Sequence, residues 1–137
     1  MSRCGAMCAL LLLATGLARA APDPGFDVVV GTLPDAKPGE HATVSLSILP
    51  RPGFRLLVDG PLTVRVSGEG VTPERPLYRR EDAVDPRAEA PRFELGFRRP
   101  KPPAREATLS ATLTFYLCRG ERCRPVTEPV YIRDRRP

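Results

Sequence analysis

Cys118 and Cys123 are the residues of this chain best suited to do chemistry. They enclose four residues, Arg119-Gly120-Glu121-Arg122, and follow a run of alternating apolar and polar side chains. A loop of this length can turn the chain into a hairpin, in which the Cα atoms of facing residues lie roughly 4.5 to 5.5 Å apart. A disulfide spans that separation easily. The spacing therefore favours a Cys118–Cys123 bond.

The place of Cys118 in the alternating run decides what such a bond could do. Odd positions of the run are apolar and even positions are polar, so we expect Cys118 on the outer face with Thr114 and Tyr116. Positive charge stabilises a thiolate and lowers the pKa of a thiol. We expect this effect from three nearby arginines, Arg119, Arg122 and Arg124. An exposed disulfide in such surroundings can take part in thiol exchange.

Two other roles for the cysteine pair must be weighed. Closing a loop of about six residues adds only ~2 kcal/mol of stability, yet small secreted domains often keep such bonds as structural staples. A metal site would need further ligands beside the two thiolates, and the only histidine is His41, which we expect on the surface at a strand start. We therefore expect neither a metal nor a cofactor.

No other catalytic motif emerges from the sequence. There is no G-x-S-x-G turn for a hydrolase and no glycine-rich phosphate-binding loop. The formal net charge of +5 is a mild excess. Such an excess favours solubility and does not indicate nucleic-acid binding.

Alternating stretches that could position the cysteines run through the whole chain. The clearest are His41 to Leu49, Leu62 to Ser67, Arg92 to Arg98 and Thr108 to Leu117, and weaker ones are Phe26 to Val30, Phe54 to Val58 and Val126 to Ile132. The 17 prolines disfavour long helices, and Pro129 indicates an edge strand. This pattern predicts an all-β fold, an immunoglobulin-like antiparallel β-sandwich of about seven to eight strands. Thr72 to Pro91 is expected to be a long polar loop, either a binding loop or plain surface.

The first 20 residues have the features of a targeting segment. Arg3, an apolar run to Leu17 and the segment Ala18-Arg19-Ala20 match a secretory signal peptide with its cleavage site. We expect a cleaved signal peptide at residues 1–20, a single domain at residues 21–137, and a periplasmic or secreted protein. The apolar run is shorter than the ~20 residues that cross a bilayer, so no stable membrane insertion is expected. A lipid anchor, the competing interpretation, would need a cysteine where Ala21 stands.

Three segments together resemble a known family. They are Pro50-Arg51-Pro52-Gly53-Phe54, Pro76-Leu77-Tyr78-Arg79-Arg80 and Phe115 to Pro125. In these segments the chain resembles the N-terminal periplasmic domain of the thiol:disulfide interchange protein DsbD, also called the disulfide bond corrector family. The best-known members have five residues between the cysteines, whereas this chain has four.

The resemblance implies an immunoglobulin-like domain whose cysteine pair passes electrons to periplasmic partners beneath a loop that caps the disulfide. Cys118 and Cys123 would be the redox cysteines, and the cap-loop or partner-contact residues would be Tyr78, Leu77 and Tyr116. The implied partners are thioredoxin-like or disulfide-containing proteins. The family's full protein continues into a membrane domain and a thioredoxin-like domain, so this module would not be a complete oxidoreductase on its own.

Two functions therefore remain open. The first is an exported thiol:disulfide interchange module that works through Cys118 and Cys123. The alternative is a non-catalytic binding or accessory β-sandwich in which the same disulfide is structural.

Overall fold

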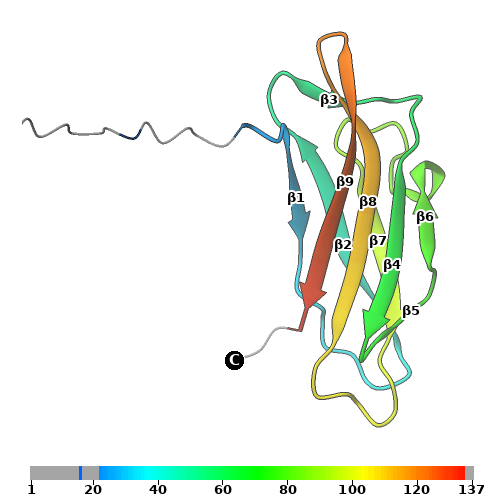
Figure 1. Ribbon diagram of the computed structural model, residues 1–137. Coiled ribbons are helices and arrows are strands. Elements are labelled where there is room, and N and C mark those ends of the chain that lie inside the picture. The colour runs from blue at the N-terminus through cyan, green and yellow to red at the C-terminus, as the bar shows by residue number, and fades with distance from the viewer. Residues whose placement is uncertain (1–15, 17–21, 135–137) are drawn as a thin grey trace, which may run out of the picture.

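The computed structural model describes Gly16 and residues 22–134, in which two antiparallel sheets pack face to face (Figure 1). One sheet has the strand order β1-β2-β7-β5 and consists of β1 Phe26–Val30, β2 His41–Pro50, β7 Arg92–Arg98 and β5 Thr72–Pro73. The other has the order β3-β8-β4-β6, with β9 also paired to β8. Its strands are β3 Phe54–Leu56, β8 Thr108–Arg119, β4 Thr63–Glu69, β6 Leu77–Arg79 and β9 Arg122–Arg133. The predicted all-β sandwich is confirmed, whereas the predicted signal peptide, apart from Gly16, lies outside the described residues.

Alternate side chains of the facing strands fill the space between the sheets. Every odd-numbered residue of β8 from Leu109 to Leu117 is buried, and the even-numbered residues between them are only partly so. Phe115 of β8 meets Phe26 of β1 edge to face, with ring centroids 5.2 Å apart. This packing determines that the odd-numbered side chains of β8 point into the core. The even-numbered side chains, including Cys118, therefore point to the outer face of the sheet.

The segment from Thr72 to Pro91 is more ordered than the sequence prediction. It contains β5, β6 and a single-turn 3-10 helix, η1, at Arg80–Asp82. These extra strands bring the total in the described residues to nine. The physical reason is Tyr78, whose side chain is buried against the Phe93 ring, with centroids 6.4 Å apart. Burying that aromatic surface draws β6 onto the edge of β4.

β9 is an edge strand, as Pro129 predicted. Arg119 and Arg122 flank the hairpin turn and form a hydrogen-bonded pair, so backbone groups at alternate positions of β9, starting with Cys123, point away from β8. Pro125 and Pro129 both belong to that outward set. Proline costs no ladder hydrogen bond there, and its missing N–H hinders pairing with a further strand.

Candidate functional site

The β8–β9 hairpin brings the two cysteines together. Gly120 has a φ of +60° and begins the turn, whereas Glu121 does not have a positive φ. A glycine with positive φ at the first central position is typical of the type II′ turn, which matches the twist of the adjoining strands. The register then places Cys118 opposite Cys123, with Cα atoms 4.0 Å apart and a disulfide between them. The bond favoured by the spacing is confirmed.

The two cysteines differ sharply in exposure. Cys123 is exposed, whereas Cys118 is 0 % exposed. Cys118 nevertheless lies outside the core cluster between the sheets, as its even position in β8 requires. The outer face is therefore covered at this one point, which the sequence prediction did not anticipate. Of the two residues joined by the disulfide, Cys123 is therefore open to solvent and Cys118 is not.

The cover over Cys118 comes from β3 and the residues that follow it. Arg55 stands directly opposite Cys118 in the β3–β8 register. Two residues further on, the Leu57 N–H donates to the Tyr116 carbonyl oxygen at 2.9 Å, which continues the pairing. Alternation turns Arg55, Leu57 and Tyr116 to the same outer face as Cys118. Leu57 and Tyr116 are each half-buried, so they share in covering the sulfur.

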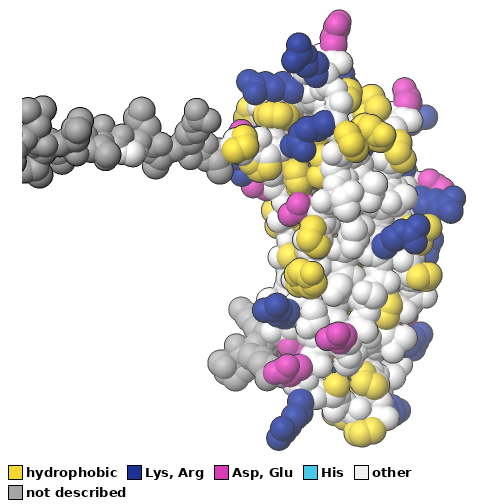
Figure 2. All heavy atoms as spheres, viewed as in Figure 1, with side chains coloured by type: hydrophobic (Ala, Val, Ile, Leu, Met, Phe, Trp, Pro, Cys, Tyr) yellow, Lys and Arg dark blue, Asp and Glu magenta, His cyan; other side chains and the backbone are white. Residues whose placement is uncertain are grey.

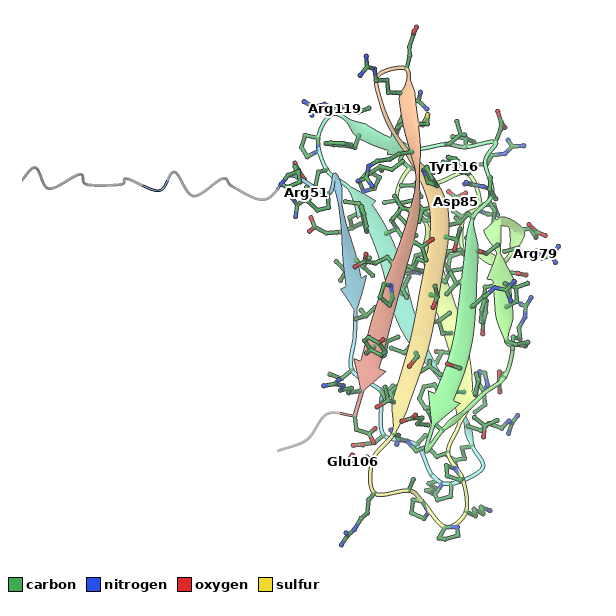
Figure 3. The ribbon with its side chains drawn as sticks, viewed as in Figure 1. Arg51, Arg79, Asp85, Glu106, Tyr116 and Arg119 are labelled. Atoms are coloured by element: carbon green, nitrogen blue, oxygen red, sulfur yellow. A yellow bond between two sulfur atoms is a disulfide. The ribbon has the colours of Figure 1, made fainter. Side chains whose placement is uncertain are left out.

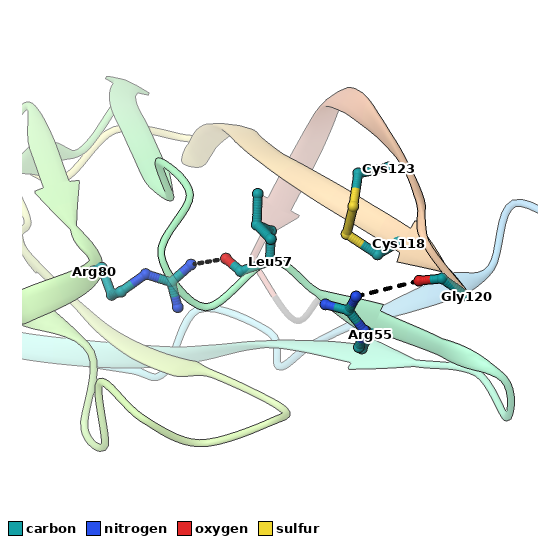
Figure 4. The surroundings of a disulfide bond; sticks show 6 residues. All are labelled: Arg55, Leu57, Arg80, Cys118, Gly120 and Cys123. Atoms are coloured by element: carbon teal, nitrogen blue, oxygen red, sulfur yellow. Dashed lines mark hydrogen bonds between the residues drawn. A yellow bond between two sulfur atoms is a disulfide. The ribbon is translucent and has the colours of Figure 1, made fainter.

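Arg55 is the arginine that the fold places beside the pair. Its guanidinium donates from Nη2 to the carbonyl oxygen of Gly120 in the hairpin turn, at 3.2 Å (Figure 4). The acceptor is an uncharged carbonyl group, so the positive charge of Arg55 is not neutralised by that contact. This charge is available to a thiolate formed at Cys118.

The three arginines predicted to stabilise the thiolates point to the other face of the hairpin. Arg119 and Arg122 face each other one position beyond the cysteines, and Arg124 stands opposite the inward-facing Leu117. Adjacent residues of a strand point to opposite faces, so none of the three shares a face with the sulfurs. The prediction assigned this role by nearness in sequence. The register gives the face on which the three side chains lie, and their effect on the thiolates stays a prediction.

Contacts on that other face agree with this placement. The Arg119 guanidinium lies 5.3 Å from the centroid of the Phe54 ring, and Arg124 donates from Nη2 to the Pro24 carbonyl oxygen. Figure 3 shows Arg119 beside the hairpin and Tyr116 further down β8. The contacts of Arg119 and Arg124 thus support the hairpin on the face opposite the disulfide. A cation over an aromatic face contributes about 0.5–1 kcal/mol at an exposed site.

A covering loop, residues 57–62, joins β3 to β4 and is held by Arg80. The Arg80 Nη2 donates to the Leu57 carbonyl oxygen at 2.9 Å (Figure 4) and to the Gly60 carbonyl oxygen at 3.2 Å. Arg80 begins helix η1, which Asp82 caps by accepting the Arg79 N–H at 2.8 Å. That bond and the Arg75 guanidinium lower the pKa of Asp82 from its ordinary 3.8, so the cap persists at every pH above that value.

The fold separates the predicted cap-loop residues from one another. Tyr116 lies on the disulfide side of the sheet and contributes to the cover. Tyr78 is opposite Val64, which is opposite Leu113, five positions along β8 from Cys118. Leu77 is opposite Arg65, still further along the sheet. The structure therefore does not bring Tyr78 or Leu77 to the disulfide, and the residues that take that place are Arg55 and Leu57.

Tyr78 has a structural task that can be tested. Its hydroxyl oxygen accepts a hydrogen bond from the buried Gly96 N–H at 3.0 Å. Tyr78→Phe keeps the ring but leaves that N–H without a partner, so we expect the free energy of unfolding to fall by about 1–3 kcal/mol. Urea unfolding measures the loss. Tyr131→Phe is the control, because the Tyr131 side chain is 60 % exposed, and an equal loss in both variants would contradict the assignment.

Three further findings concern the part of the chain that the structure describes. Within those residues no group of three or more His, Cys, Asp or Glu side chains could hold a metal ion. His41 is exposed, as expected, and its Nδ1 is paired with the Glu74 carboxylate. In the same residues, no helix has the length and apolar character needed to span a membrane.

The chemistry of the site thus rests on a half-sheltered disulfide, the Arg55 guanidinium beside it and the covering loop fixed by Arg80. No family model, curated protein or solved structure matches the chain.

Proposed function

We propose that this protein is an exported thiol:disulfide interchange module, in which the Cys118–Cys123 pair passes electrons to thioredoxin-like or disulfide-containing proteins of the periplasm. The observation that carries the proposal is the unequal exposure of the two cysteines, with Cys123 exposed and Cys118 fully buried. A structural staple gains nothing from such asymmetry. An exchange reaction needs one sulfur that can be attacked and one that can leave.

The reaction begins when a thiolate of a reducing partner attacks Cys123 Sγ. A partner–Cys123 disulfide forms, the Cys118–Cys123 bond breaks, and Cys118 leaves as a thiolate. A second thiolate of the partner then attacks the partner's own sulfur and releases Cys123. Two electrons reduce the pair, and the partner's dithiol is oxidised to a disulfide. Run in reverse with an oxidised partner, the Cys123 thiolate attacks and Cys118 resolves the mixed disulfide.

Arg55 favours the step in which Cys118 leaves. A leaving thiol of lower pKa departs faster, and a nearby guanidinium lowers the pKa of a thiol. Because Cys118 is buried, desolvation acts in the opposite direction and would raise that pKa. The positive charge of Arg55, held at the hairpin turn by Gly120, offsets that penalty.

Two features of the sequence support the same function. The segment Phe115 to Pro125 resembles the cysteine segment of the disulfide bond corrector family. The signal-peptide pattern at residues 1–20 favours a periplasmic setting, in which a pair of exported cysteines meets an oxidising environment.

The reduction potential of the pair is the direct test. We expect a value above about −300 mV, because structural disulfides typically lie below it. Arg55→Ala should make the potential more negative, by about 30 mV for each 1.4 kcal/mol of thiolate stabilisation lost. Equilibration with glutathione buffers measures both values, and Arg65→Ala, an exposed arginine further along the sheet, is the control. A wild-type potential below about −300 mV would end the redox assignment.

A structural disulfide in a non-catalytic binding domain is the second candidate, favoured by the complete burial of Cys118. It makes a different forecast. The double variant Cys118→Ser with Cys123→Ser would lose about 2 kcal/mol of stability but would keep its partner binding. Loss of partner binding at unchanged stability would contradict this candidate.

A further inference from the structure

We infer that a cleft beside the disulfide receives an extended, acidic segment of the protein that exchanges with Cys123. The inference rests on the proposed function, since it assigns the chemistry of the redox partner. The cleft has a volume of about 490 Å³. Its walls are the turn Pro50–Gly53 with β3, Val58 and Arg80, and the segment Arg87–Ala90. Arg55 belongs both to this cleft and to the surroundings of Cys118.

Positive charge dominates the cleft. Four arginines line it, and Glu89 is the one carboxylate among its lining residues. Arg51 is already neutralised, because it forms ion pairs with Asp23 at 2.7 Å and Asp27 at 2.9 Å. Figure 2 shows Lys and Arg side chains gathered at the hairpin end of the molecule.

The side chains of the other three arginines form no ion pair within the described residues. The guanidinium groups of Arg55 and Arg80 donate to backbone carbonyl oxygens, and of Arg87 only the backbone N–H meets a carboxylate, that of Asp85 at 3.0 Å. In addition, the Arg80 Nε is buried without a hydrogen-bond partner. Three unneutralised charges against one carboxylate make an anionic occupant the complementary one.

The backbone favours an extended chain as that occupant. β3 ends the strand order of its sheet, so its second edge is unpaired in the part of the chain that the structure describes. Arg55 pairs with Cys118 of β8 and the Leu57 N–H also donates to β8, so Leu56, which lies between them, directs its own N–H and C=O to the cleft side. An added strand could bond these groups, as in recognition by β-augmentation. Phe54, Val58 and the prolines supply apolar contacts for alternate side chains.

Peptide binding tests the cleft apart from the redox chemistry. The probe is a labelled hexapeptide of alternating glutamate and valine, with a lysine–valine hexapeptide as its counterpart, and fluorescence anisotropy measures binding to the oxidised full chain. We expect only the acidic peptide to bind, and Arg87→Glu to weaken it by about tenfold or more. Arg65→Glu, outside the cleft, should leave binding unchanged. Equal binding of both peptides, an unchanged Arg87→Glu variant, or competition by free glutarate at equal concentration would overturn the inference.

Thiol exchange then links the cleft to the disulfide. With a single cysteine added, the acidic peptide should reduce the pair faster than the basic one, and Arg87→Glu should abolish the difference. The rate with 2-mercaptoethanol should be the same in both proteins. If 2-mercaptoethanol reacts but peptide charge has no effect, the cleft inference fails alone. If the acidic peptide binds but no thiol reduces the Cys118–Cys123 bond, the proposed redox function is wrong. The inference that the bound segment belongs to a redox partner is then wrong as well.

Discussion

Cys118→Ser should trap a mixed disulfide between Cys123 and a partner thiol, whereas Cys123→Ser should trap roughly tenfold less or none, because access governs thiol exchange. Cys123 is exposed and Cys118 is fully buried, on the same sheet face as Arg55, Leu57 and Tyr116. In the first variant the free sulfur can be reached and no resolving cysteine remains. In the second, the remaining sulfur is covered.

The partner is a single-cysteine thioredoxin-like protein whose sulfur carries 2-nitro-5-thiobenzoate as a disulfide, so that the Cys123 thiolate attacks the partner sulfur and the nitrothiobenzoate thiolate leaves. The measurement is the yield of the resulting mixed disulfide on a non-reducing gel, confirmed by mass spectrometry. Both variants lose the same disulfide, so their stabilities should be similar, and urea unfolding checks this. The double variant sets the background. Equal yields from the two single variants would show that burial of Cys118 does not control the reaction.

Arg80→Ala should both destabilise the protein and speed the reduction of the disulfide. The substitution removes two hydrogen bonds from a charged donor to the carbonyl oxygens of Leu57 and Gly60. Such bonds are worth about 1.5–3 kcal/mol each, so we expect a loss of about 2 kcal/mol or more. With the covering loop released, small thiols should reach the disulfide more readily, because locally opened segments expose what they cover.

Arg79→Ala is the matched control for this effect. Arg79 is the adjacent arginine and its side chain is exposed (Figure 3), while its backbone N–H, which Asp82 accepts, survives the substitution. Reduction by 2-mercaptoethanol, followed by alkylation of the freed thiols, gives the rates. An unchanged rate in Arg80→Ala despite lowered stability would show that the covering loop does not limit access to the disulfide.

Features that depend on neighbouring residues were predictable from the sequence. The period-two pattern of β8 fixed its inward residues, and the spacing of the cysteines favoured their bond, because both follow from local backbone geometry. The same rule could have corrected the arginine assignment. Arg119 follows Cys118 directly and Arg124 follows Cys123, so each must point away from the sulfur beside it.

Contacts between distant segments were not predictable in this way. Arg55 reaches the disulfide only because β3 pairs with the end of β8, and Arg80 reaches the covering loop only because β6 adds to β4. Neither pairing leaves a local mark in the sequence. The first pairing sets β3 beside Cys118, so a residue on the polar side of a strand ends up shielded.

The prolines of β9 bear on how long a partner stays. Pro125 lies two residues beyond the exposed Cys123 and belongs, with Pro129, to the outward-facing set of that edge. A partner chain that reaches Cys123 therefore cannot form a continuous ladder of backbone hydrogen bonds along β9. In the interchange function that we propose, each partner must be released after a single transfer of two electrons. Because the prolines prevent long backbone pairing along this edge, they favour rapid release of a partner over a lasting complex.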